Sequence, residues 1–262
     1  MNHGDYTERS VNSRGKYLPA QATTIPDISH SLLKGPCVTV RVGSGETAEE
    51  FSVHKALIAH HSPFFKAALG GPWKGGREGS LDLPEDEPST FNLYVCWLYG
   101  VFVLRPVSGC CSNPEGVSPT CRQLTAMSNA YKLGNKFLDL DFCNMVIDRI
   151  CDHGKANKAV PTGPFLEIWN VSARGSKPRN LILDSFRHEG QSSWFEDLTA
   201  TEYDQELWLE IARALAVGKE EHPNDSRSPW RDDTCPYHHH SNSQKTCYKK
   251  IKDMRDETPK TG

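Results

Sequence analysis

The sequence has no long apolar run and no strong excess of charge of either sign. No apolar segment approaches the ~18 residues that a transmembrane helix needs, so we expect no membrane span. The 30 basic and 33 acidic side chains leave a net charge of -3, which favours neither nucleic acid nor a polyanion as a non-specific partner. The polar segment 1–16 lacks the apolar core of a secretory signal. We therefore expect an intracellular protein, cytoplasmic or nuclear, that is not secreted.

The sequence also lacks the motifs of common enzymes. It contains no Gly-rich phosphate loop, no paired carboxylate site and no closed metal motif. A catalytic histidine needs a partner and a cleft, and nothing in the sequence supplies either for His54. Ser62 is better explained as a helix cap ahead of Pro63 than as a nucleophile beside His61. We expect no catalytic residues, no cofactor and no enzymatic activity.

Apolar residues are scarcer than in a fully globular chain. They make up 37% of the 262 residues, whereas ~45–50% is typical, so part of the chain is not expected to fold. The composition divides it into four segments. These are a disordered arm at 1–26, a domain with a dense core at 27–152, a helical extension at 153–217 that packs back on the domain, and a disordered polar tail at 218–262.

The domain is predicted to be of the α+β class, a small sheet flanked by short helices. Alternating apolar residues predict strands at 38–42 and 50–53, joined as a hairpin, and a third strand at 81–83. Apolar residues at helical spacing predict the helices. We expect them at 28–34, 54–61, 63–69, after Pro88, at 123–133 with Gly134 at its end, at 139–151, and in the extension near 164–169, 180–187 and 202–217.

Nine cysteines are an odd number, and in the absence of a secretory signal we interpret them as reduced thiols. Cys110, Cys111 and Cys121 fall in one predicted loop. Zinc sites need pairs of ligands separated by two to four residues, which this spacing does not provide. We expect these three residues to be exposed loop thiols.

The polar tail contains a second group of potential metal ligands. Cys235 and His238 have chelating spacing, and His240 with Cys247 would complete a set of four ligands. However, Pro236 lies inside the spacing, and no apolar residues surround the group to build a core. The expected state is a disordered His-rich tail with weak adventitious metal affinity, and a zinc site is the alternative.

Several segments, in order and at matching spacings, resemble the BTB/POZ domain. Their amino-acid sequences are similar to those of the filamentous-fungal branch of that family. The resemblance covers about residues 28–152. It rests on Val38-Thr39-Val40, Phe51-Ser52-Val53-His54-Lys55-Ala56-Leu57-Ile58, Ser62-Pro63-Phe64-Phe65, Leu81-Asp82-Leu83-Pro84-Glu85-Asp86-Glu87-Pro88, Trp97-Leu98-Tyr99-Gly100 and Ala130-Tyr131-Lys132-Leu133-Gly134-Asn135-Lys136-Phe137.

The resemblance implies a non-catalytic protein–protein interaction module that mediates homo- or hetero-dimerisation or scaffolding. Some members of the family recruit a cullin scaffold to make ubiquitin ligases, and others act in transcription complexes. By this resemblance, Ile28, Leu32 and Leu33 would pair with a second chain. Trp73, followed by Lys74, would present an exposed aromatic side chain of the kind enriched at binding hot spots.

Two departures from the family pattern bear on the choice of partner. Cys37 stands where the family often has an acidic residue, so a dimer contact that needs this carboxylate is not available. Cullin-binding members tend to carry a hydrophobic-x-Glu triplet, but Trp73-Lys74-Gly75 ends in glycine and Glu78 has the wrong spacing. We therefore favour a dimerising or scaffolding module over a substrate adaptor for a cullin ligase. A zinc-binding, transcription-associated regulator is the third alternative.

Overall fold

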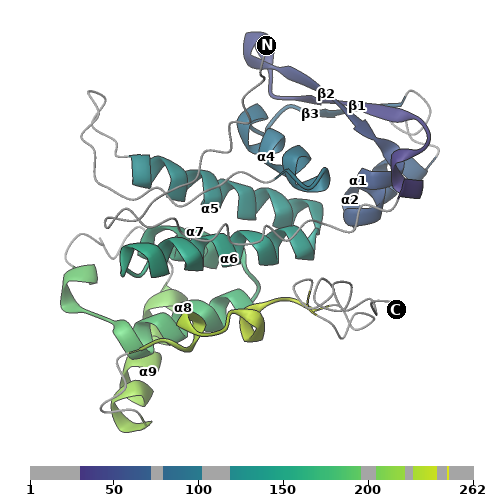
Figure 1. The fold of residues 1–262 in the computed structure, drawn as a ribbon. Coiled ribbons are helices and arrows are strands. Elements are labelled where there is room, and N and C mark those ends of the chain that lie inside the picture. Colours follow the sequence, from purple (N-terminus) through teal and green to yellow (C-terminus); the bar gives the residue numbers. More distant parts are fainter. Residues whose placement is uncertain are drawn as a thin grey trace, which may run out of the picture.

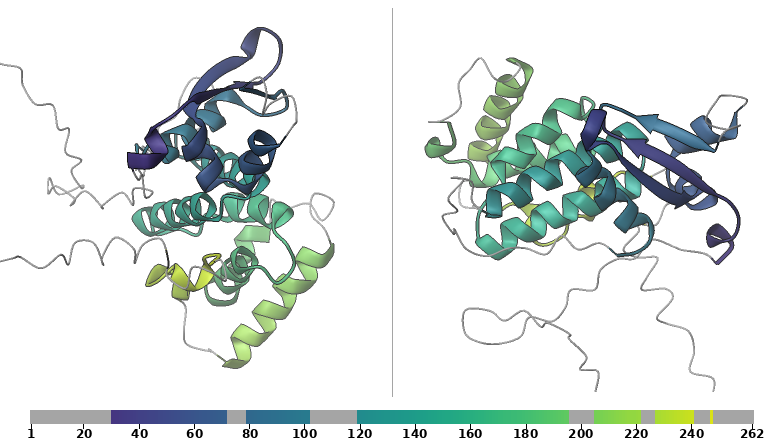
Figure 2. Two further views of the ribbon diagram at one scale, coloured as in Figure 1. Left: turned by 90° about the vertical axis from the view of Figure 1, so that its right-hand side faces the viewer. Right: turned by 90° about the horizontal axis from the view of Figure 1, so that it is seen from above.

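The computed structural model describes residues 30–71, 79–101, 119–195, 205–221, 227–240 and 247. Within them, a small sheet and the first helices form one end of the molecule, two long helices cross the middle, and the remaining helices and the C-terminal segment form the other end (Figures 1 and 2). The predicted α+β class, a small sheet flanked by helices, is confirmed.

The sheet has three strands in the order β2-β1-β3. Strands β1 (Cys37–Val42) and β2 (Glu49–His54) form the predicted antiparallel hairpin, and β3 (Ser80–Leu83) runs parallel to β1. Side chains alternate across a strand, and every second residue of β1 is fully buried. These residues are Val38, Val40 and Val42.

Three helices follow the strands closely in the chain. They are α1 (Lys55–His61), α2 (Pro63–Gly70) and α4 (Pro88–Leu98). The Ser62 hydroxyl oxygen accepts a hydrogen bond from the Phe65 N–H at 3.2 Å, and Pro63 opens α2, so the predicted cap is confirmed. The same hydroxyl donates to the carbonyl of Phe137 at 2.6 Å. Ser62 thus both starts α2 and holds it to a distant part of the chain.

The middle of the molecule is built from α5 (Pro119–Phe137) and α6 (Leu140–Asn157). We expected Gly134 to end the first of these helices, but α5 continues through it by one further turn. A Cβ at this position would lie 2.7 Å from the ring of Phe142 on α6, so the glycine serves close packing of two helices and not a helix end. Asp139 then caps α6 by accepting the Phe142 N–H at 2.9 Å.

The helical extension comprises α7 (Thr162–Val171), α8 (Lys177–Glu189) and α9 (Gln205–Glu221). Helix α7 packs on α5, α8 packs on α7, and α9 packs on α8. Trp169, Ile182 and Ile211 of the extension belong to the same continuous core as the strand residues. The extension therefore packs back on the first unit, as predicted.

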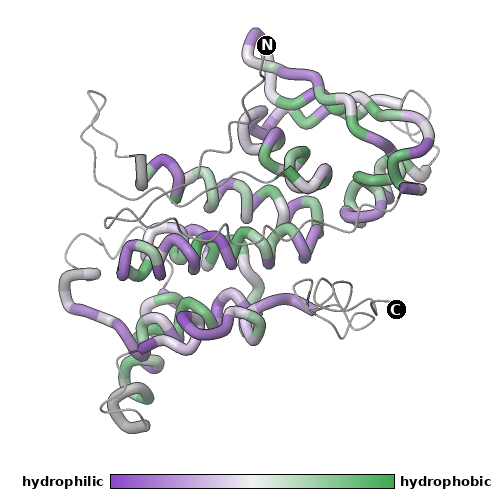
Figure 3. Tube along the Cα trace, in the orientation of Figure 1, coloured by the Kyte–Doolittle hydropathy of each residue, from purple (hydrophilic) through white to green (hydrophobic). Residues whose placement is uncertain are grey.

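Hydrophobic and hydrophilic residues are interspersed along the strands and helices, as Figure 3 shows. This patterning gives each element one face for the core and one for the outside. Among the described residues, no helix combines the length and the apolar character that crossing a membrane would require.

The prediction of a disordered tail from residue 218 is wrong for residues 227–240. Helix α9 runs on to Glu221, and the later segment contains two short 3-10 helices, η4 (Pro229–Arg231) and η5 (Cys235–Tyr237). Although the segment is almost entirely white to purple in Figure 3, Trp230 and His238 are fully buried in it. A few side chains anchor the segment to α6 and α8. The average composition of the segment does not reveal such individual contacts. The predicted arm at 1–26 lies outside the described residues.

Candidate metal centre

The local backbone of the C-terminal segment brings three potential metal ligands to one side. In a 3-10 helix, residues three apart lie above one another, and η5 places Cys235 and His238 in this way. The His238 N–H donates to the Cys235 carbonyl at 3.1 Å. His238 itself has extended dihedral angles, and the ring of His240, two residues later, lies 6.0 Å from that of His238.

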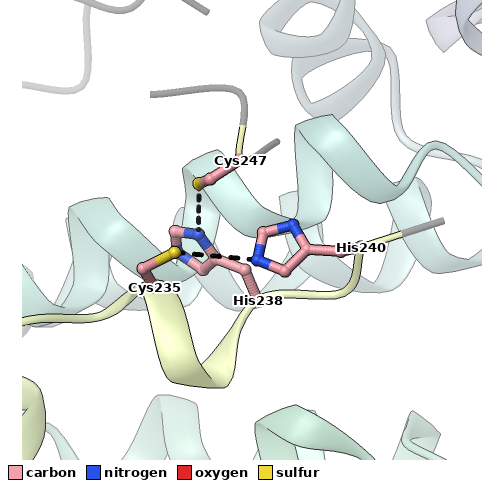
Figure 4. A group of neighbouring side chains, drawn as sticks. All are labelled: Cys235, His238, His240 and Cys247. Carbon is pink, nitrogen blue, oxygen red and sulfur yellow. Dashed lines mark hydrogen bonds between the residues drawn. The ribbon is translucent and has the colours of Figure 1, made fainter. Parts of the chain in front are cut away.

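Cys247 completes the cluster from beyond the turn, as the zinc alternative in the sequence anticipated. One ligand atom from each of the four side chains lies within 4.8 Å of the other three. His238 Nδ1 is 3.3 Å from Cys247 Sγ, and Cys235 Sγ is 3.7 Å from His240 Nε2. Figure 4 shows the four side chains pointing toward one another. His238 and Cys247 are buried, Cys235 is half-buried and His240 is exposed.

A polar stripe on α6 orients His238. Asp148 Oδ1 lies 3.0 Å from His238 Nε2, and the Thr234 hydroxyl also donates to this carboxylate. Because Nε2 faces the carboxylate, the other ring nitrogen of His238 faces Cys247. This arrangement matches the carboxylate–histidine pairs that fix the tautomer and ring orientation of metal-binding histidines.

One turn earlier on α6, Asn144 holds the main chain of the same segment. Its side-chain amide donates to the His239 carbonyl and its side-chain oxygen accepts the His239 N–H, both at 2.8 Å. Residues four apart lie on one face of a helix, so Asn144 and Asp148 act together. Residues 238–239 are therefore docked on α6 through both their backbone and a buried imidazole.

Burial is the main cause of the pKa shifts of two ionisable groups near the cluster. Burial raises the pKa of Asp141, although the neighbouring imidazoles of His240 and His238 act in the opposite direction. Burial also lowers the pKa of His239, and the charges of the flanking histidines add to this effect. Both shifts favour neutral forms of these side chains.

The segment that carries the ligands packs against apolar parts of the helices through its own tryptophan. Trp230 is fully buried, with its ring 6.3 Å from that of Phe165 on α7. It also lies against Gly154 of α6, where a Cβ would be 3.1 Å from the indole. The expectation that no apolar residues surround the ligands is therefore wrong, since Cys247 is part of the buried apolar core and Cys235 packs against that core.

Helix α8 provides a second set of anchors. Arg231 makes a bidentate contact with Glu189, at 2.7 Å from Nε and 2.5 Å from a terminal nitrogen. The Ser228 N–H donates to the same carboxylate at 3.0 Å. Further along, the Tyr237 hydroxyl donates to Asp184 at 2.8 Å. Helix α8 thus anchors the segment both before and within the turn that carries the ligands.

The residues assigned to protein interaction are only partly described. Leu32 and Leu33 lie in η1 (His30–Leu33), half-buried against the core, so the helix predicted at 28–34 is present as one short 3-10 turn. The others fall outside the described residues. These are Ile28, Trp73, Lys74 and Gly75, together with the loop thiols Cys110 and Cys111.

Two other residues considered in the sequence analysis, Cys121 and His54, are described by the structure. Cys121 is exposed as expected, but it lies in the first turn of α5 and not in a loop. His54 Nδ1 is 2.7 Å from the hydroxyl oxygen of Tyr99, which also accepts the His54 N–H at 3.1 Å. This pair joins the start of α1 to the end of α4.

Sequence reasoning missed Asp148 and Asn144. The signal that would have found them is two polar residues, four apart, that fall among the apolar core positions of this helix, Cys143, Val146, Ile147 and Cys151. Comparison with known proteins adds no relative, since neither a protein-family model nor a curated protein matches the chain.

Proposed function

We propose that the chain is a non-catalytic protein–protein interaction module of the BTB/POZ type, and that it pairs with a second copy of itself as a dimerising or scaffolding unit. One observation carries the proposal: segments quoted for the resemblance, far apart in the sequence, bury their apolar residues in one shared core. That core includes Val53, Ile58, Phe65, Leu83, Trp97 and Tyr131. A sequence pattern that also packs together in space supports the resemblance better than the pattern alone.

The surface proposed for pairing is the η1 turn and the neighbouring first strand. No residue of η1 is buried, and Leu32 and Leu33 leave part of their apolar surface uncovered. Contiguous apolar surface can mark an interaction site, and most soluble homo-oligomers are symmetric dimers. Cys37, at the start of β1, is exposed beside them.

The test is sedimentation equilibrium of the full chain and of the Leu32→Ala/Leu33→Ala variant. We expect a reversible dimer, weakened in the variant. Leu209→Ala is the matched control, because Leu209 is a leucine of α9 that is 51% exposed, at the opposite end of the molecule from η1 (Figures 1 and 2). Circular dichroism checks that each variant is folded. A monomeric wild type, or a dimer that the double variant leaves unchanged, would overturn the proposal.

The alternatives from the sequence differ in the partner that they require. A cullin adaptor would use Trp73 and its neighbours, so affinity purification from native cells should then recover a cullin in near-stoichiometric yield, and Trp73→Ala should abolish that recovery. A transcription-associated zinc protein is favoured only by the grouped cysteines and histidines. Recovery of the chain with itself, and without a cullin, agrees with the dimerising module.

A further inference from the structure

We propose that Cys235, His238, His240 and Cys247 form a structural Zn²⁺ site. The metal would fix the conformation in which the C-terminal segment packs on α6 and α8. The site is independent of the pairing surface proposed above, so either proposal can fail without the other.

The donor set selects the metal. Two thiolates and two imidazoles in a tetrahedral arrangement are typical of Zn²⁺, whereas carboxylate and carbonyl oxygens suit Mg²⁺ and Ca²⁺. Four protein ligands also leave no open position for water or substrate, which is the signature of a structural site and not of a catalytic one. The C-x2-H spacing of Cys235 and His238 is that of a chelating pair.

The separations fit a tetrahedron of the right size. Zn–S and Zn–N bonds of about 2.3 and 2.0–2.1 Å place a sulfur and a nitrogen ligand about 3.6 Å apart. The two sulfur–nitrogen pairs in the structure lie 3.3 and 3.7 Å apart. Two sulfur ligands would be about 3.8 Å apart and two nitrogen ligands about 3.3 Å, so atoms that lie within 4.8 Å of one another need to approach by no more than about 1.5 Å.

His238 is already oriented to bind. With Nε2 against the Asp148 carboxylate, the ring donates its proton there and presents the Nδ1 lone pair to the metal. The ring is fully buried, so it has no freedom to turn toward solvent. His240, being exposed, would coordinate through Nε2, the atom that faces Cys235.

All four ligands come from residues 235–247, so the metal would cross-link only this segment. Next to the ligands the segment is attached to α6 by Asp148 with His238 and by Asn144 with His239, in addition to the contacts of Arg231 and Tyr237 with α8. Both contacts with α6 require the conformation of the turn and of the residues that follow it, which the four ligands would hold around the metal. Loss of the metal is therefore expected to loosen the 227–240 segment and to leave the sheet and the first helices folded.

The test begins with elemental analysis of the full chain purified in the reduced form without chelator. We expect one zinc per chain. Replacement by Co²⁺ should give the intense visible absorption of tetrahedral cobalt together with a thiolate-to-cobalt charge-transfer band. Cys247→Ser should lose stoichiometric binding. Cys121→Ser is the matched control, because it removes an exposed thiol that is not a ligand.

Hydrogen exchange then tests the structural role. Chelation of the metal should accelerate exchange in 227–240 and leave β1 and α2 unchanged. Weak binding that is the same in wild type and Cys247→Ser would overturn the proposal, since adventitious histidine binding does not need the thiol. A six-coordinate cobalt spectrum, or stoichiometric zinc whose removal does not change exchange in the segment, would also overturn it.

Discussion

Asp148 Oδ1 on α6 lies 3.0 Å from Nε2 of His238, ninety residues later in the chain. His238 is fully buried and Asp148 nearly so. A buried carboxylate is costly unless it is paired, and the imidazole and the Thr234 hydroxyl supply its partners. This contact connects the candidate metal centre to the folded core.

Asp148→Asn tests whether this carboxylate positions the ligand. The variant keeps an acceptor oxygen but loses the charge, so we expect zinc affinity to fall by about 10–100-fold with the ligand set intact. Competition with a chromophoric chelator measures the change. Asp152→Asn is the control, because Asp152 lies one turn later on α6 and pairs with Arg149. Equal affinities in the two variants would exclude a positioning role.

Glu189→Gln tests the anchor on α8. Burial alone would raise the pKa of Glu189, but hydrogen bonds from Arg231 and Ser228 outweigh it and lower the pKa. A carboxyl with a lowered pKa stabilises the folded state above its ordinary value of 4.5, and this contribution is lost as the pH falls through the lowered value. We expect the variant to lower the free energy of local opening of residues 227–240 by about 1.5–3 kcal/mol at neutral pH, as measured by hydrogen exchange.

The control for Glu189 is an ion pair in the same segment. Arg227 and Asp232 are 2.7 Å apart, but their side chains are 63% and 71% exposed. Exposed ion pairs contribute little to stability, so Asp232→Asn should change the free energy of local opening by less than about 1 kcal/mol. Equal effects of the two substitutions would show that the Arg231–Glu189 contact is not a specific anchor.

Asp139 predicts a pH dependence of stability. Burial raises its pKa from 3.8 to about 7, although the hydrogen bond from the Phe142 N–H opposes this. Between these values the folded state keeps a proton that the unfolded state has released, so stability falls as pH rises from about 4 to about 7. Asp139→Asn retains the cap but cannot ionise. Urea unfolding across this range should lose that slope in the variant, and an unchanged slope would contradict the assignment.

Gly134→Ala tests the close approach of α5 and α6. Alanine favours helix, yet its Cβ would lie 2.7 Å from the buried ring of Phe142 and 2.9 Å from Cys143 Sγ. We expect a net loss of about 1–3 kcal/mol in unfolding free energy. Gly163→Ala on α7 is the matched control, because a Cβ there meets nothing within 4 Å. A neutral Gly134→Ala would show that the two helices separate at little cost.

Local patterns predicted most of the fold. Alternation identified β1, and the Ser62-Pro63 pair correctly marked the start of α2. The reading of Gly134 as a helix end was wrong, because glycine also permits close packing, and only the neighbouring helix distinguishes the two roles. The docked segment 227–240 was missed for a similar reason. Its order depends on Asn144 and Glu189, which lie far from it in the sequence.

The candidate site could be predicted in part. The spacing of Cys235, His238, His240 and Cys247 identified the four residues as an alternative ligand set, because the chelating pattern is local, although the expected state was a disordered tail with adventitious affinity. The orientation of His238 by Asp148 could not be predicted, because it depends on how the segment meets α6. The interaction residues rest on the BTB/POZ resemblance, and of these only Leu32 and Leu33 are described.

Native mass spectrometry of the full, reduced chain at micromolar concentration tests the central claim most directly, because it counts chains and metal ions together. A pairing module with a structural zinc site predicts a species of twice the 29.3 kDa chain mass that carries two zinc ions. A species of single-chain mass would contradict the pairing, and chains free of zinc would contradict the metal site.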